Sequence, residues 1–182
     1  NLLTHIILDQ SKSMTYASAD ISKLEYSKIL SASLAYLMLK QQDGVGLTLF
    51  DSKIRALIEP KSKSNHIKSL FSIMENTNPG PDTKIGDILH ISAESIKKKG
   101  LVILISDFFD DIESIISGIK HYRYKGNEVI VFHVLDPKEF SLSFDERTEF
   151  IDLETEESIT TDPWHIQNDY NKKMIDFCKT LE

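Results

Sequence analysis

The sequence predicts an α/β fold, a doubly wound and mostly parallel sheet with one antiparallel edge strand and helices on both faces. Three segments repeat one order along the chain: a helix-like stretch, a glycine and a short apolar run. The runs "LVILIS" and "VIVFHV" are continuously apolar, as expected for parallel strands that are covered on both faces. Helical patterns alternate with these runs, which is typical of an α/β sandwich.

Five longer strands and one short edge strand are expected. The stretch "VGLTLFDSKIRALIEP" is typical of a hairpin around "DSK", so its second strand is expected to be antiparallel and at an edge. The segment "TEFIDLE" is a further short edge strand. In the three repeated segments the glycine fits the left-handed position just past a helix end. The parallel strands are expected at residues 3–8, 45–50, 101–106 and 129–134, and the antiparallel strand at 54–58.

Four helices carry apolar stripes, which we interpret as core. Ser22 and Glu25 can form a capping box ahead of the first helix. Asp162 followed by Pro163 is a good N-cap and first-turn pair for the last helix. The stripes are Leu30, Leu34, Leu37 and Met38; Ile85, Ile88, Leu89 and Ile96; Ile112, Ile115, Ile116 and Ile119; and Ile166, Tyr170, Phe177 and Leu181.

The chain is expected to form one domain over residues 1–182. Its 182 residues are enough for a single core, and no internal repeat, low-complexity segment or linker interrupts them. Residue 1 is Asn and a strand is expected to start almost at once. We therefore expect the chain to be a fragment of a longer protein.

Composition and charge exclude several classes of function. The chain has 21 basic and 28 acidic residues, a net charge of -7, which disfavours a nonspecific nucleic-acid partner. A single cysteine excludes an intrachain disulfide and fits a reducing compartment. No apolar run approaches the roughly 20 residues that span a bilayer, and no signal peptide is visible. We expect a cytoplasmic location, without membrane contact by this fragment.

Oxygen-bearing side chains gather at the predicted carboxyl ends of two strands. Ligands of open parallel sheets bind there, where the strand order reverses. Asp9 ends the first strand and Asp107 ends "LVILISD". Residues two apart in an extended segment point the same way, so Asp9, Ser11 and Ser13 are expected to converge. Thr83 opens a helix after a Pro/Gly-rich loop and supplies another oxygen. Such ligands suit a hard cation, Mg²⁺ (or Mn²⁺).

Each of these residues also has a structural alternative. Ser11 and Ser13 can bond to their own backbone as loop residues, and Thr83 can be an N-cap alone. An aspartate is also needed to cap the helix that begins near residue 112. The candidates for that cap are Asp107, Asp110 and Asp111.

The three motifs together resemble the von Willebrand factor A (vWA) domain and its metal-ion-dependent adhesion site. They are "DQSKSM", "DTKIGDIL" and "LISD", in the family's order of strand–D-x-S-x-S, T-x-x-G at a helix start and strand-end aspartate. The resemblance covers essentially the whole chain. It implies one divalent cation at the top of the sheet, with five ligands: Asp9, Ser11, Ser13, Thr83 and Asp107.

Longer segments narrow this resemblance. "KLEYSKILSASLAYLMLKQQDGVGLTLFD", "KGLVILISDFFDD" and "VFHVLDPKEF" are similar to a bacterial domain-of-unknown-function family of vWA-like proteins, often found beside MoxR-type AAA+ ATPases. The resemblance implies further sequence on both sides. Two departures alter the rim of the site: Asp82 replaces the commoner glycine before Thr83, and Lys12 lies inside the first motif. Every ligand position is filled.

The sequence therefore predicts a divalent-metal-dependent protein–protein interaction module and not an enzyme. The family resemblance implies a MoxR-type ATPase as partner, in assembly or maturation of other proteins, and the ion is expected to bind an acidic side chain of the partner. The alternative is a metal-dependent phosphohydrolase or nuclease on a similar sheet. Two-metal hydrolysis needs ions about 3.5–4 Å apart and more bridging carboxylates than two. A third alternative is a scaffold that has lost its metal.

Overall fold

The central sheet has five strands in the order β3-β2-β1-β4-β5. The computed structural model describes the whole chain except residues 1, 81–83, 142–147, 152–157, 162 and 182. β1 pairs in parallel with β2 and β4, β4 pairs in parallel with β5, and β3 is the antiparallel edge strand beside β2. The predicted fold class is confirmed. The strands span Leu3–Asp9 (β1), Gly44–Phe50 (β2), Ile54–Lys61 (β3), Leu101–Ser106 (β4) and Glu128–His133 (β5).

The strand order reverses between β1 and β4, and the register there aligns their carboxyl ends. Leu8 of β1 lies opposite Ile105 of β4. Asp9 and Ser106, the last residues of the two strands, therefore come next on neighbouring strands. The candidate site residues Asp9 and Asp107 lie at this edge, as predicted.

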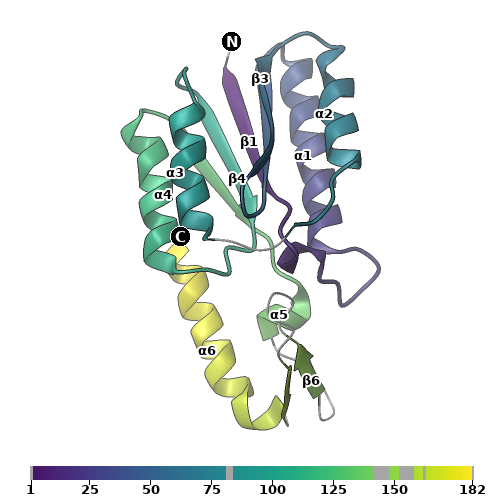
Figure 1. Cartoon of the computed structure of the whole chain (residues 1–182), viewed down its shortest axis with the longest axis vertical. Coiled ribbons are helices and arrows are strands. Elements are labelled where there is room, and N and C mark those ends of the chain that lie inside the picture. The colour runs from purple at the N-terminus through teal and green to yellow at the C-terminus, as the bar shows by residue number, and fades with distance from the viewer. Residues whose placement is uncertain (1, 81–83, 142–147, 152–157, 162, 182) are drawn as a thin grey trace.

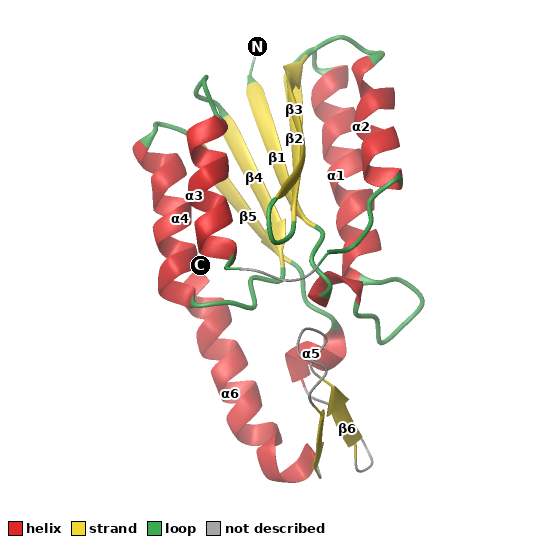
Figure 2. Ribbon diagram, viewed as in Figure 1, coloured by secondary structure: helices red, strands yellow, loops and turns green. Residues whose placement is uncertain are grey.

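Two pairs of helices cover the two faces of the sheet (Figures 1 and 2). α1 (Lys23–Lys40) and α2 (His66–Glu75) lie on one face, and α3 (Ile85–Ser95) and α4 (Ile112–Tyr124) lie on the other. The Ser22 half of the capping box predicted for α1 is confirmed, because the Ser22 side chain accepts a hydrogen bond from the Glu25 amide at 3.1 Å. α2 and the short 3₁₀ helix η1 (Ser13–Thr15) were not predicted.

The elements that follow β5 extend beyond the carboxyl ends of the strands (Figure 1). They are α5 (Pro137–Ser141), β6 (Thr148–Ile151), β7 (Ser158–Thr161) and α6 (Pro163–Leu181), which returns to α4. The "TEFIDLE" strand was placed wrongly: β6 pairs with β7 in a separate two-stranded sheet and does not extend the main one. Antiparallel pairing with the next segment satisfies its backbone locally. The predicted cap Asp162 lies outside the described residues.

Apolar side chains form one cluster under α1 and α2 and another under α3 and α4. The stripe predicted for α3 is confirmed, since Ile85, Ile88 and Leu89 are buried. The stripe predicted for α1 is partly wrong: Leu37 is 53% exposed. Small residues let a helix approach a sheet closely. In α1 this close packing, and not the number of apolar side chains, decides which residues face the sheet. The buried residues of α1 are Lys23, Leu24, Ser27, Ser31, Ala35 and Leu39.

The left-handed glycine prediction holds at one of the three helix ends. Gly126, after α4, has φ +85, but after α1 the positive φ belongs to Gln42 and not to Gly44. Gly100 instead allows the backbone before β4 to pass close to β1, since a Cβ at this position would lie 2.0 Å from the carbonyl oxygen of Leu3. Among the described helices, none is both long enough and apolar enough to cross a bilayer.

Candidate metal centre

Asp9 is the central residue of the candidate site. As the last residue of β1 its side chain is fully buried, at 0% exposure. Its Oδ1 accepts a hydrogen bond from the Ser11 amide at 2.8 Å, and its Oδ2 accepts one from the Ser106 hydroxyl at 2.6 Å. The carboxylate is thereby fixed between the end of β1 and the end of β4.

The hydroxyls of Ser11 and Ser13 meet, with 3.1 Å between their oxygens. The backbone conformation between Ser11 and Ser13 differs from the prediction, which assumed an extended segment. Lys12 has helical backbone angles (φ -64, ψ -34) and Ser13 begins η1, so a turn and not a strand brings the second hydroxyl back. The meeting of the Ser11 and Ser13 hydroxyls agrees with the prediction, but the extended geometry was wrong for Ser13.

Asp107 follows β4 and is 1% exposed. Its Oδ1 accepts a hydrogen bond from the Phe109 amide at 3.3 Å, and its Oδ2 accepts one from the Lys23 ammonium at 2.8 Å. The next residue, Phe108, is fully buried with φ 53, a left-handed conformation that is rare for a bulky residue. Such backbone strain is found at positions that a function constrains.

His133 fixes the same turn from β5. Its Nε2 lies 2.9 Å from the carbonyl oxygen of Asp107, so Nε2 carries a hydrogen and donates it. Burial, the main cause, lowers the pKa of His133. A neutral imidazole in this tautomer suits the role, because it holds the Asp107 backbone without adding a charge.

Thr83 lies outside the described residues, but the segments on either side of it approach the site. Ser11 forms an isolated parallel bridge with Gly80, whose amide donates to the Gln10 carbonyl at 3.2 Å. On the other side, the Ile85 amide at the start of α3 donates to Asp110 at 2.5 Å. The chain on both sides of Thr83 is therefore attached to the loops that carry the other candidate ligands.

The helix-cap alternative is resolved in favour of Asp111. Its side chain accepts a hydrogen bond from the Ser114 amide at 2.8 Å and caps α4. Asp110 accepts from the start of α3 instead. Asp107 caps neither helix, so its buried carboxylate stays with the candidate site.

Lys23 is a site residue that the sequence interpretation missed. Its ammonium group is buried, with 2% side-chain exposure, and contacts Asp107 at 2.8 Å and Glu139 of α5 at 2.7 Å. The sequence held one signal: Lys23 is the first residue of α1, where the helix dipole favours an acid and disfavours a cation. A lysine in this position needs anionic partners.

The electrostatics of the site favour a bound cation. Burial, the largest cause, and the neighbouring charge of Asp107 together raise the pKa of Asp9 to about 7, against the hydrogen bonds from Ser106 and Ser11 that lower it. No basic side chain contacts Asp9 within the part of the chain that the structure describes. An ionised Asp9 in this environment needs a positive charge, which a divalent ion supplies.

The donor set fits a hard cation and no softer one. Two carboxylates and two hydroxyls offer only oxygen, the ligand type of Mg²⁺ and Mn²⁺. No group of three or more His, Cys, Asp or Glu side chains gathers as a metal cluster in the described ranges. A cation held by Asp9, Ser11, Ser13 and Asp107 would therefore meet only two carboxylates.

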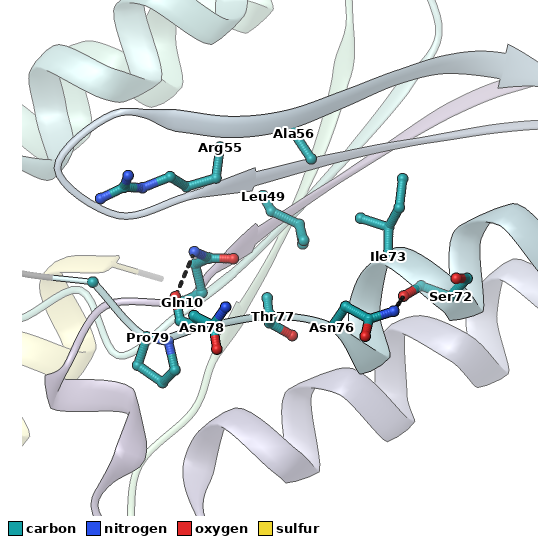
Figure 3. Close-up of a pocket in the computed structure, with 11 residues that line it drawn as sticks. Gln10, Leu49, Arg55, Ala56, Ser72, Ile73, Asn76, Thr77, Asn78 and Pro79 are labelled. Carbon is teal, nitrogen blue, oxygen red and sulfur yellow. Dashed lines mark hydrogen bonds between the residues drawn. The ribbon is translucent and has the colours of Figure 1, made fainter.

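A pocket of about 580 Å³ opens beside the first motif, between the β2–β3 hairpin and the end of α2 (Figure 3). Gln10, next to Asp9, forms part of its wall: its side-chain amide donates to the Asn78 carbonyl at 3.1 Å and to Asp51 at 3.3 Å. Arg55 is fixed by Asp51 at 2.7 Å. The remaining lining is mixed, with Leu49, Ala56, Ser72, Ile73, Asn76, Thr77, Pro79 and Gly80.

The family of the chain follows from its sequence. The profile described as "Protein of unknown function DUF58" matches residues 1–176. The chain belongs to the DUF58 family. No curated protein is detectably similar to this DUF58 chain in sequence.

Solved structures share the fold of the DUF58 chain. An aerotolerance-related membrane protein from Bacteroides fragilis is 20% identical, with a TM-score of 0.66 over 97% of this chain and 89% of that one. The conserved hypothetical protein BatB from Bacteroides thetaiotaomicron is 21% identical, with a TM-score of 0.63 over 96% and 86%. A von Willebrand factor type A structure from Catenulispora acidiphila is 13% identical, with a TM-score of 0.47 over 97% and 42%. At these identities the first two similarities show the fold alone.

Proposed function

We propose that this DUF58 chain is a divalent-cation-dependent protein-interaction module of the vWA type. The observation that carries the proposal is the fully buried Asp9 carboxylate, which feels the charge of a second buried carboxylate, Asp107, and lies next to the converging hydroxyls of Ser11 and Ser13. The ligands of Mg²⁺ (or Mn²⁺) in this proposal are Asp9, Ser11, Ser13, Thr83 and Asp107, a metal-ion-dependent adhesion site.

The charge of the site explains why a partner would bind through the ion. Two carboxylates at most neutralise a divalent cation, and the hydroxyls add no charge. An acidic side chain of a partner gains a charge-assisted contact by replacing water on the ion. The exposed Lys12 and Lys84 flank ligand positions and add attraction at the rim, which favours an acidic partner.

The pocket beside Gln10 offers a second contact surface for the same partner. It shares Gln10 and Gly80 with the loops of the site. Its amide, hydroxyl and apolar groups suit a peptide segment that flanks the acidic side chain. A short peptide bound to both would be fixed in position and direction.

The first partner to test is a MoxR-type AAA+ ATPase, with which the chain would act in assembly or maturation of other proteins in the cytoplasm. The family resemblance of the motifs suggests this partner. An enzyme is the second candidate, and we infer that the chain is not one. Asp110 and Asp111, the carboxylates that a second metal would require, bond to helix starts instead. Phosphate release from generic phosphoesters with Mn²⁺ would contradict this inference.

The experiment is capture of a MoxR-type ATPase from the same organism on the immobilised chain. We expect capture with millimolar Mg²⁺, loss with EDTA and recovery when Mg²⁺ is restored. Ser11→Ala removes a ligand and should weaken capture about tenfold, whereas Ser33→Ala, an exposed serine of α1 that bonds only its own helix, should not. A complex that survives EDTA at full affinity would place the interaction on another surface.

A further inference from the structure

Lys23 occupies a position that ordinary helix rules disfavour. It is the first residue of α1, after the cap Ser22, and only 3% of its surface is exposed. The start of a helix repels cations, and a buried ammonium group is costly unless it is paired. Since neither cost is offset within α1, the reason for Lys23 lies in what it contacts.

The contacts of Lys23 are acidic and come from distant parts of the chain. The ammonium group lies 2.8 Å from Oδ2 of Asp107 and 2.7 Å from Oε1 of Glu139. It also lies 4.9 Å from the centre of the Phe109 ring, a cation–π distance. Glu139 is itself held, because its other oxygen accepts from the Asp136 amide at 3.1 Å. Lys23 is therefore fixed against the candidate ligand Asp107.

The cluster around Lys23 stays negative without a metal ion. Asp9, Asp107, Asp136 and Glu139 carry four negative charges when ionised, and the one positive charge of Lys23, which also acts on Asp136, leaves a net charge of about -3. A cation of charge +2 offsets most of it. Lys23 and the ion also compete, because both bind Asp107 and repel each other at short range.

We propose that Lys23 is a built-in counter-cation of the metal centre. It stabilises the fold without metal by pairing Asp107, and it lowers the affinity for Mg²⁺ so that the ion exchanges. The inference rests on the proposed function for the existence of the metal site, and it adds a residue that acts on the ion through Asp107 and Glu139 without being a ligand.

The test is Lys23→Met, which keeps the length of the side chain and removes the charge. We expect two opposite effects: Mg²⁺ binds about tenfold more tightly by calorimetry, and the variant unfolds at lower urea concentration in EDTA. The matched control is Lys97→Met, which removes the same charge from an exposed ion pair with Glu59 and should change neither quantity. A Lys23→Met protein that is unfolded in EDTA and folds when Mg²⁺ is added would support the proposed role of Lys23 equally well.

A second variant covers the case in which Lys23→Met does not fold under either condition. Lys23→Arg keeps the charge and should hold the Mg²⁺ dissociation constant within about threefold of the wild type. A tenfold tighter constant in Lys23→Arg would mean that packing and not charge sets the affinity, and would overturn the proposal.

The outcomes separate this inference from the proposed function. If the wild type and Lys23→Met bind Mg²⁺ equally well, the role of Lys23 is wrong and the metal-dependent function stands. If only Lys23→Met binds Mg²⁺, the role of Lys23 stands and the native chain does not work through a metal. If neither binds, both are overturned.

Discussion

Ser106 donates its hydroxyl hydrogen to Oδ2 of Asp9 across 2.6 Å. The same oxygen of Ser106 accepts a hydrogen bond from the Phe108 amide at 2.9 Å. One hydroxyl therefore connects the carboxylate at the end of β1 to the strained turn that carries Asp107. Ser106 is the last residue of β4 and 1% exposed, so the sheet itself fixes its direction.

We predict that Ser106→Ala weakens Mg²⁺ binding near neutral pH. The hydrogen bond from Ser106 lowers the pKa of Asp9, so its removal raises that pKa and leaves more of Asp9 protonated. A hydrogen bond to a charged group contributes about 1.5–3 kcal/mol, which corresponds to a loss of about tenfold or more in affinity. Calorimetric titration at neutral pH measures it. The loss of Mg²⁺ affinity in Ser106→Ala should become smaller in alkaline buffer, where Asp9 is ionised in both proteins. An equal loss at every pH would mean that protonation of Asp9 is not its cause.

We predict that Asp9→Asn abolishes the stabilisation of the chain by Mg²⁺. An ion that binds only the folded state contributes about 2.7 kcal/mol at a hundredfold excess over its dissociation constant. The amide keeps the shape of the carboxylate and removes its charge, so the melting temperature in EDTA should match that of the wild type at low pH and exceed it near neutral pH, where Asp9 ionises. Asp87→Asn, at an exposed position of α3, is the control. A metal response that persists in Asp9→Asn would move the ion to other carboxylates, such as Asp110 and Asp111.

The sheet could be predicted because its signals are local. Continuous apolar runs locate β1, β2, β4 and β5, and the "DSK" turn locates the antiparallel β3. The separate pairing of β6 with β7 could not be predicted, because a short strand carries no signal for which neighbour it joins. The helix α1 shows a second limit of prediction from sequence. Ser27 and Ser31 face the core and Leu37 faces solvent, because the buried face of α1 is selected by how closely it packs on the sheet and not by hydrophobicity.

Four of the five candidate ligands fall within the described residues, and their positions could be predicted only in part from the sequence. Strand-end position correctly placed Asp9 and Asp107 on one edge. The extended spacing was wrong for Ser13, because a 3₁₀ turn follows Ser11. Lys23 was missed because its partners, Asp107 and Glu139, are 84 and 116 residues away along the chain. Long-range ion pairs leave no periodic pattern in a sequence.

We predict that Gly86→Ala destabilises the fold by about 1–3 kcal/mol, the usual cost of overpacking a core. Gly86 lies at the start of α3 where it crosses α4, and a Cβ there would lie 2.8 Å from the backbone carbonyl carbon of Ser114. The glycine of the T-x-x-G motif is therefore explained by helix packing. Urea unfolding in EDTA measures the loss. Ala93→Gly, at a buried position of the same helix, separates overpacking from general helix effects, because it should cost only about 1 kcal/mol in helix propensity plus a lost methyl group.

The last prediction concerns pH. Burial and Asp107 raise the pKa of Asp9 from 3.8 to about 7 in the folded chain. Without metal, the folded state therefore holds this proton more tightly than the unfolded state between these two values. The contribution of Asp9 to stability then falls as pH rises through this window, by at most about 1.4 kcal/mol for each pH unit, and is constant above it.

Mg²⁺ should suppress this pH dependence near neutrality. The ion requires the ionised carboxylate, so its stabilising effect grows as pH rises through about 7, the pKa of Asp9. Urea unfolding of the wild type and Asp9→Asn, between about pH 5 and pH 8, measures both effects. The difference between the two proteins cancels the other titrating groups, including His5 and His133, whose pKa values burial lowers. In EDTA the wild type should lose stability relative to Asp9→Asn as pH rises, and in saturating Mg²⁺ the difference should stay nearly flat, because the ion has already displaced the proton. A decline that is the same in EDTA and in Mg²⁺ would mean that no metal ion replaces the proton of Asp9.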